Sequence, residues 1–238
     1  MTFGQMQTDA LDLLQEIQNH PQYTISKLKH YLNQGNMAFA RKTKAIEGTI
    51  DITTVANQFE YDESDKSTLA NIYIPYQVRY VDGSEVGDQL KPWPGGYTNL
   101  PKRYSYGTPT YYWLRNLHAR STTNPAAYTG VRFGTWPIAG TADKTIRIDA
   151  FLHPATLVTE AAEPEYKDTW GDAPVHYAVS RMFAIFSHLN PSWDRKAMFH
   201  MSEFERLVSD ANQDMSYQSD EPIELEDVYY QMDSWSYV

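Results

Sequence analysis

Histidine and carboxylate side chains are the groups in this chain best suited to bind a metal or to move a proton. The histidines are His20, His30, His118, His153, His176, His188 and His200. None of them belongs to an HExxH pair, and the chain has no cysteine that could add a thiolate ligand. His176 and His188 fall on one expected helix but more than three turns apart, so only the packing of the next helix could bring His200 to either. We therefore expect no metal site.

Acidic and aromatic residues of the middle of the chain suggest a glycoside hydrolase as the strongest enzyme alternative, because such enzymes need paired carboxylates and aromatic platforms. The candidates are Trp93, Trp113 and Trp136, with Asp62, Glu63, Asp65 and Asp149. The same rings could instead serve a carbohydrate- or receptor-binding tail module without cleavage chemistry. However, the acidic run at 62–65 is typical of a solvated loop, and tryptophans in strands more often fill cores. We expect no catalytic residue.

Motifs for nucleotide chemistry are also missing from the sequence. The glycine pair Gly95–Gly96 forms neither a phosphate-binding loop nor a dinucleotide fingerprint, and no GxSxG elbow occurs. We therefore expect no cofactor and assign the chain to the non-enzymatic proteins.

Composition favours protein partners over nucleic acid or membrane. The chain has 18 tyrosines and a net charge of -10, so its overall field repels DNA while its amphipathic rings suit interfaces. No run of apolar residues is long enough to cross a membrane, and the N-terminus does not resemble a signal peptide. The absence of cysteine agrees with assembly in a reducing cytoplasm.

Helices are predicted at both ends of the chain. Thr2 and Gln5 form a capping-box pattern before a helix expected over residues 3–18, and Thr24 is the expected N-cap of a second. The second helix has an apolar stripe of Ile25, Leu28, Leu32 and Phe39. Towards the C-terminus a third helix begins near Asp172, with a stripe of Val175, Val179, Met182, Phe186 and Leu189. Ser192 is the expected cap of a fourth, antiparallel helix.

The middle of the chain has the β-branched, alternating pattern of strands. Strands are expected from Gly48, around Ile72 to Val81, and over 110–114, 131–138 and 144–152, with an acidic loop at 61–65. Residues 82–105 are rich in turn formers and tyrosines and form a long excursion. The fold class is therefore α+β, a helical bundle of N- and C-terminal helices with an inserted antiparallel β domain. We expect a helical body at 1–47 and 158–215 and a β-rich domain at 48–157.

The last segment, residues 216–238, is acidic, contains no lysine or arginine, and cannot build a core alone. Its rings are Tyr217, Tyr229, Tyr230, Trp235 and Tyr237. Such residues are typical anchors of an extended tail that orders on a partner.

Several stretches together resemble the head-to-tail adaptor (connector) proteins of tailed bacteriophages. The run TISKLKHYLNQGNMAFARKTKAIEGTIDI contains the family's Tyr-Leu-Asn element at Tyr31–Asn33, and GVRFGTWPIAGTADKTIRIDAFLHPATL ends in its Pro-x-x-Leu step at Pro154–Leu157. YIPYQVRYVDG and DTWGDAPVHYAVSRMFAIFSHL match in order and character. Two departures are YDESD in place of a Leu-Pro turn and a longer, tyrosine-rich stretch over 82–124.

The resemblance implies a virion structural protein in the neck between capsid and tail, made in the host cytoplasm. It implies a dodecameric ring under the portal protein that joins capsid to tail and lines the DNA exit channel, with DNA passing without specific binding. The five tail rings are then the expected portal-docking residues. The expected contacts with a tail nozzle, tail tube or fibre protein are Trp93, Tyr97, Tyr104 and Tyr106.

Overall fold

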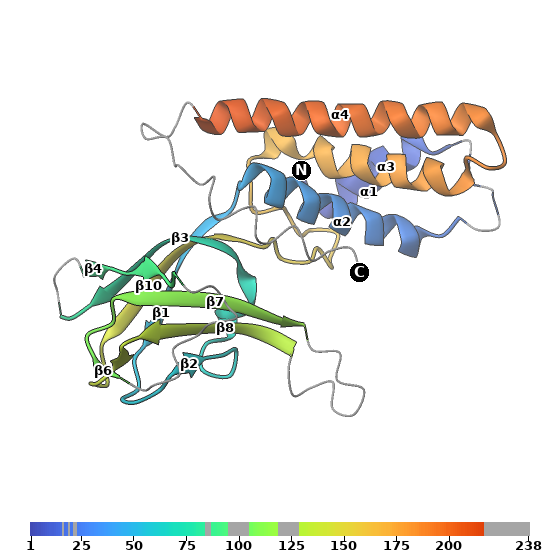
Figure 1. Cartoon of the computed structure of the whole chain (residues 1–238). Coiled ribbons are helices and arrows are strands. Elements are labelled where there is room, and N and C mark those ends of the chain that lie inside the picture. The colour runs from blue at the N-terminus through green and yellow to red at the C-terminus, as the bar shows by residue number, and fades with distance from the viewer. Residues whose placement is uncertain are drawn as a thin grey trace.

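The computed structural model combines a bundle of four helices with a region of β-sheets, and the bundle is built from both ends of the chain (Figure 1). It describes residues 1–15, 17–18, 20, 23–83, 87–94, 105–118 and 129–216. The α+β class predicted from the sequence is confirmed, with β-sheets inserted between the N-terminal and C-terminal helices.

The N-terminal helices are α1, Phe3–Leu13, and α2, Ile25–Thr43. Both predicted caps form: Thr2 and Gln5 make a reciprocal capping box, and the Thr24 hydroxyl accepts from the Lys27 amide. Helix α1 is shorter than the predicted 3–18. The chain tightens after Leu14, because the Leu14 amide bonds to both Ala10 and Leu11 and the Gln18 side chain then donates to the Leu11 carbonyl.

The C-terminal helices are α3, Asp172–Phe186, and α4, Pro191–Ser216. The predicted cap of α4 is wrong by two residues. Asn190 Oδ1 accepts from the Ser192 amide at 2.9 Å, so the capping side chain comes from Asn190 and the proline occupies the first helical position, where its missing N–H costs nothing. Short 3₁₀ turns at Ser67–Asn71 and Asp168–Trp170 complete the helical content of the described residues.

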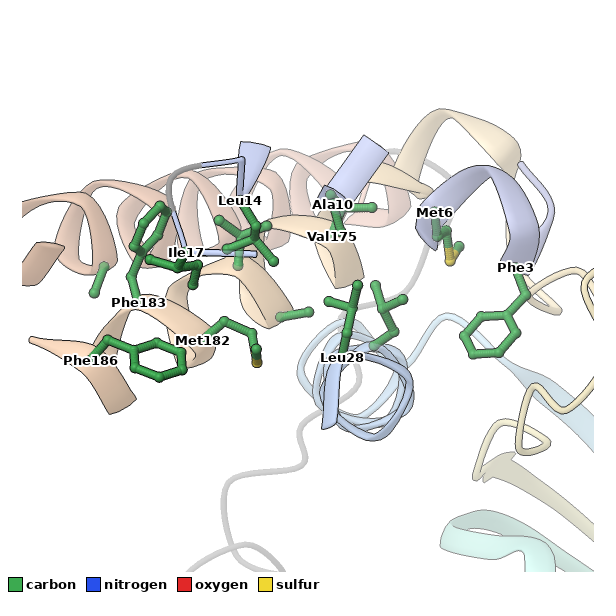
Figure 2. Close-up of a cluster of buried hydrophobic side chains, with 14 of the residues drawn as sticks. Phe3, Met6, Ala10, Leu14, Ile17, Leu28, Val175, Met182, Phe183 and Phe186 are labelled. Atoms are coloured by element: carbon green, nitrogen blue, oxygen red, sulfur yellow. The ribbon is translucent and has the colours of Figure 1, made fainter. Parts of the chain in front are cut away.

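Helices α1, α2 and α3 share one apolar core, and Figure 2 shows the side chains of α1 and α3 converging on Leu28 of α2. The fully buried members include Phe3, Met6, Ala10, Leu14, Ile17, Leu28, Leu32, Val179, Met182 and Phe186. Burial was wrongly predicted for two residues of the apolar stripes. Ile25 and Leu189 are exposed, because one lies in the first turn of α2 and the other beyond the end of α3.

A second core joins α4 to α2 and α3 through Phe39, Ala173, Phe204, Val208 and Ala211. The α2 and α3 backbones approach closely at Gly35, where an added Cβ would lie 2.9 Å from the Pro174 carbonyl oxygen. Glycine at this position therefore permits the packing of the two helices.

The β region contains two four-stranded sheets. The first has the order β1 (Glu47–Thr53), β10 (Thr145–Leu152), β3 (Ile72–Val81) and β4 (Asp88–Gln89). The second has the order β2 (Glu60–Tyr61), β8 (Thr129–Trp136), β7 (Tyr111–His118) and β5 (Lys91–Pro92). The long pairings are antiparallel, whereas β5 runs parallel to β7, and β6 (Tyr106–Gly107) runs parallel to β9 (Ile138–Ala139).

The two sheets bury a common core to which both contribute, including Ile50, Ile52, Val78, Leu114, Phe133, Ile146 and Ile148. Tyr61 also belongs to it and is 1% exposed, so the loop predicted at 61–65 begins one residue later. Alternating burial in β10 holds as far as Ile148 and is then interrupted by a register shift opposite Pro75, a residue that has no N–H to donate to the ladder.

Candidate functional site

Two of the nine rings predicted to contact partners lie in the described part of the chain. Trp93 follows β5 and is half-buried, with its ring 5.5 Å from both Tyr111 and Trp136 in edge-to-face packing. Tyr106 is 57% exposed on β6 and presents its ring to solvent. Tyr97, Tyr104, Tyr217, Tyr229, Tyr230, Trp235 and Tyr237 lie outside the described residues.

Trp113 lies in the protein interior and is not available as a platform for a sugar. This ring is 3% exposed, packs on Phe59 and donates from Nε1 to Glu60 at 3.1 Å. Glu60 also accepts from Arg115 at 2.6 Å and from Arg132 at 3.3 Å. Trp93 and Trp136 pack against each other instead of lying side by side as a flat surface, so the three tryptophans do not form a common platform.

The carboxylates considered for hydrolysis serve structural contacts instead. Asp62 accepts from the backbone and hydroxyl of Ser64, and these hydrogen bonds lower the pKa of the Asp62 carboxyl. Asp65 accepts from the Asp62 amide at 2.9 Å, and Glu63 accepts from the Val131 amide at 3.2 Å. Asp149 lies in the other sheet, where it accepts from Thr49 and is paired with Arg79 at 2.5 Å. None of the four lines the cleft beside Asn36 or the one beside Asp51.

Among the histidines, the structure brings His176 of α3 and His200 of α4 together, with their Nδ1 atoms 3.0 Å apart and their rings stacked. Burial lowers the pKa of both, and for His200, with the charges of His176 and Lys196 added, to about 4. His188 lies in the turn after α3, where Nδ1 contacts the Ile185 carbonyl. In the residues that the structure describes, no three histidine or acidic side chains are placed to hold a metal ion.

The helical bundle is attached to the segment after β10 by the Asn33 side chain of α2. Its Oδ1 accepts from the Leu157 amide at 2.7 Å, and its Nδ2 donates to the Leu157 carbonyl at 3.0 Å. Asn36, one turn later, donates to the Ala155 carbonyl at 3.5 Å. The Ala155 amide in turn donates to Glu165 at 3.2 Å. The side-chain amides of Asn33 and Asn36 thus fix the path of residues 155–157. Asn33 belongs to the Tyr-Leu-Asn element, and residues 155–157 belong to the Pro-x-x-Leu element.

Beside this joint a groove of about 550 Å³ is open to solvent. It is lined by residues 30–41 of α2, by Tyr177 and Arg181 of α3, and by residues 154–156. This groove was not predicted from the sequence, because its walls come from three segments that are far apart in the chain. The signal that the sequence did give was the outward-facing cation Arg41.

A family model for the SU10 adaptor protein matches residues 1–224. The chain belongs to the SU10 adaptor protein family. This is a phage adaptor family, so the resemblance seen in the sequence is confirmed for all but the last 14 residues. No curated protein sequence matches the chain significantly.

Membership of the SU10 adaptor family supports a structural role rather than a catalytic one. It agrees with what the described side chains do: the tryptophans, carboxylates and histidines singled out for chemistry are committed to packing, ion pairs and hydrogen bonds. No helix in the described part of the chain is long and apolar enough to cross a membrane.

Proposed function

We propose that this SU10 adaptor family member is a head-to-tail adaptor of the virion, which forms a ring beneath the portal, joins capsid to tail and lines the DNA exit channel. The family match over residues 1–224 carries the proposal. A ring under a twelve-fold portal is closed by one repeated head-to-tail interface, so each protomer must offer two different faces to its neighbours.

Exposed apolar residues of α4 and the α3–α4 turn offer one such face. Met198 and Phe199 are 66% and 57% exposed, and Leu189 is 51% exposed at the turn. Large apolar side chains are costly to leave in water, and methionine and phenylalanine are enriched at the centres of interfaces. We assign them to the contact between neighbouring protomers.

The net charge of -10 suits a conduit for DNA. Phosphates sliding past a negative lumen meet repulsion rather than ion pairs, which keeps the passage free of tight contacts. Residues 217–238 contain six of the chain's acidic residues and no basic one, and we assign Tyr217, Tyr229, Tyr230, Trp235 and Tyr237 to docking on the portal. Four of these rings lie beyond residue 224, where the family match ends.

Trp93, Tyr97, Tyr104 and Tyr106 are assigned to contact with a tail nozzle, tail tube or fibre protein. The exposed ring of Tyr106 supports this assignment most directly, whereas Trp93 also packs on Tyr111 and Trp136.

The test mixes the purified full chain with the portal ring of its virion and images the product by electron microscopy. A stacked ring on the outer end of the portal is expected. A chain ending at Met215 should lose portal binding while keeping the circular dichroism of the full chain. In a matched variant, Asp220, Glu221, Glu224 and Glu226 are changed to the corresponding amides. This variant loses negative charge but keeps the aromatic rings, so it separates their contributions to portal binding. Bare portals beside free full-length protomers would overturn the adaptor assignment and favour a tail-side, receptor-binding role.

A further inference from the structure

The groove between α2, α3 and residues 154–156 is positively charged although the chain as a whole is acidic. Arg41 and Arg181 both line it, both are exposed, and neither has a carboxylate partner among the described residues. Arg41 is oriented by the ring of Tyr73, 5.5 Å from its guanidinium, and by Nδ1 of His153 at 3.5 Å. Two exposed guanidinium groups along one groove, one of them oriented by its neighbours, form a binding surface for carboxylates.

One wall of the groove also contains a buried polar atom without a hydrogen-bond partner. Asn36 is 1% exposed, its Nδ2 donates to Ala155, and its Oδ1 accepts no hydrogen bond from any described residue. A buried acceptor in this state costs free energy until a donor reaches it. A backbone N–H of an extended peptide in the groove would satisfy it. The lining therefore suits an acidic peptide rather than a small anion.

The C-terminal segment of the same chain has the matching chemistry. Residues 220–227 read DEPIELED and contain five carboxylates and no cation. The segment also starts from the helices that form the groove. Met215, on the last turn of α4, packs against the same apolar cluster as Ala38 and Tyr177, and both of these residues line the groove.

The distances allow the contact within one chain. Lys42 is next to Arg41 and is paired with Glu205 at 2.7 Å. Glu205 lies eleven residues before Ser216 on α4, or about 16 Å along the helix. The eleven residues from Ser216 to Asp227 can extend to roughly 36 Å. The acidic run is therefore long enough to extend back along the helix past the level of Glu205 and Lys42, next to Arg41.

We propose that residues 220–227 of the chain's own C-terminal segment bind in the basic groove formed by α2, α3 and residues 154–156. Carboxylates pair with Arg41 and Arg181, and a backbone amide donates to Asn36. This goes beyond portal docking, which we assigned mainly to rings after residue 228. The groove holds residues 220–227 along the helical bundle. The aromatic residues that follow, from Tyr229 onwards, then leave the bundle from a defined place.

Paramagnetic relaxation in the full chain tests the contact. Because the chain has no cysteine, Val228→Cys carries one nitroxide at the end of the acidic run. The backbone amides of residues 30–34, on the far half of the groove wall, should lose peak intensity relative to the reduced label. Arg181→Glu should restore that intensity. Arg195→Glu, the same charge change at an exposed position of α4 outside the groove, should leave the loss unchanged.

A mixed sample distinguishes the chain's own segment from that of a neighbour. Isotope-labelled chain without cysteine is combined with unlabelled, nitroxide-bearing chain, and no loss of intensity is expected. Loss of intensity in the mixed sample would show a second copy in the groove and overturn the proposal, as would unchanged amide signals in the sample in which every chain carries the nitroxide. Neither result bears on portal binding, which is read separately by microscopy.

Discussion

Asn33 of α2 holds Leu157 by both backbone polar groups at once, accepting from its amide at 2.7 Å and donating to its carbonyl at 3.0 Å. The two residues are 124 positions apart in the chain, and Leu157 is 5% exposed within the bundle core. A side-chain amide that mimics a strand partner in this way fixes both the position and the direction of the segment. Asn33 is therefore the main polar anchor of the segment leading from the β region back to the bundle, with Asn36 adding a longer hydrogen bond to Ala155.

Replacing Asn33→Ala should lower the free energy of unfolding by about 2 kcal/mol, because the Leu157 amide is left buried without an acceptor. Chemical denaturation of the purified chain measures the change. Gln34→Ala is the matched control, since it removes a neighbouring exposed amide whose side-chain hydrogen bond in the described part of the chain is to His30. Equal effects of the two substitutions would contradict the role given to Asn33.

The Glu60 carboxylate should be the most sensitive charge in the β region. Its side chain is 11% exposed and neutralises both Arg115 and Arg132 while accepting from Trp113. Glu60→Gln removes the paired carboxylate from Arg115 and Arg132, and about 3 kcal/mol of stability should be lost. Asp51→Asn provides the control, because the Asp51–Arg147 pair is exposed on both sides and contributes less than about 1 kcal/mol. A larger loss of thermal stability in Asp51→Asn than in Glu60→Gln would refute this order.

Local signals in the sequence were enough to place most helix starts and strands. Thr2 with Gln5 and Thr24 are correct caps because capping depends on residues three apart. The end of α1 was misjudged because the apolar spacing continues through Ile17 although the backbone tightens at Leu14. Side-chain periodicity does not report where carbonyls change partners.

Contacts between distant segments could not be predicted from the sequence. His176 and His200 lie 24 residues apart on two helices, and their approach depends on the register of α3 against α4, which no spacing rule specifies. The groove joins Arg41, Arg181 and residues 154–156 across more than a hundred positions. Asn33 was singled out only through its place in an adaptor-like element, and its partner Leu157 in another such element became visible in the structure.

Acidification should weaken the protein between about pH 6.5 and 4. The pKa of His200 and that of His153 are each lowered to about 4 by burial and nearby positive charge, from Lys196 and His176 in one case and Arg41 in the other. In the unfolded chain both imidazoles take up a proton near pH 6.5, so the unfolded state binds more protons across this window. Stability is therefore complete above pH 6.5 and is lost as the pH falls towards 4.

For His200 the loss should be about 1 to 2 kcal/mol, less than the full linkage value because water reaches part of the imidazole pair. Denaturant unfolding at a series of pH values measures it. His200→Gln should flatten the stability curve in this window, and adding His153→Gln should flatten it further. A curve for the double variant with the slope of the parent would rule out these two groups as the cause.

The exposed apolar residues of α4 provide a prediction specific to assembly, and it depends on the adaptor proposal. Met198 and Phe199 make small contributions to the fold, since more than half of each side chain is exposed. Met198→Ser with Phe199→Ser should therefore leave the thermal midpoint nearly unchanged. The same pair should greatly reduce the number of complete rings seen on portals, because every protomer contact in a closed ring repeats the defect.

Val55→Ser is the control for this experiment. Val55 is 51% exposed in the β region, so its replacement removes a comparable exposed apolar group away from α4. Rings should form on portals with this variant as they do with the parent chain. Complete rings from the Met198 and Phe199 double variant would instead place the contact between protomers on another face. Partial arcs would locate the contact on α4, because they show that some protomers still associate although the ring does not close.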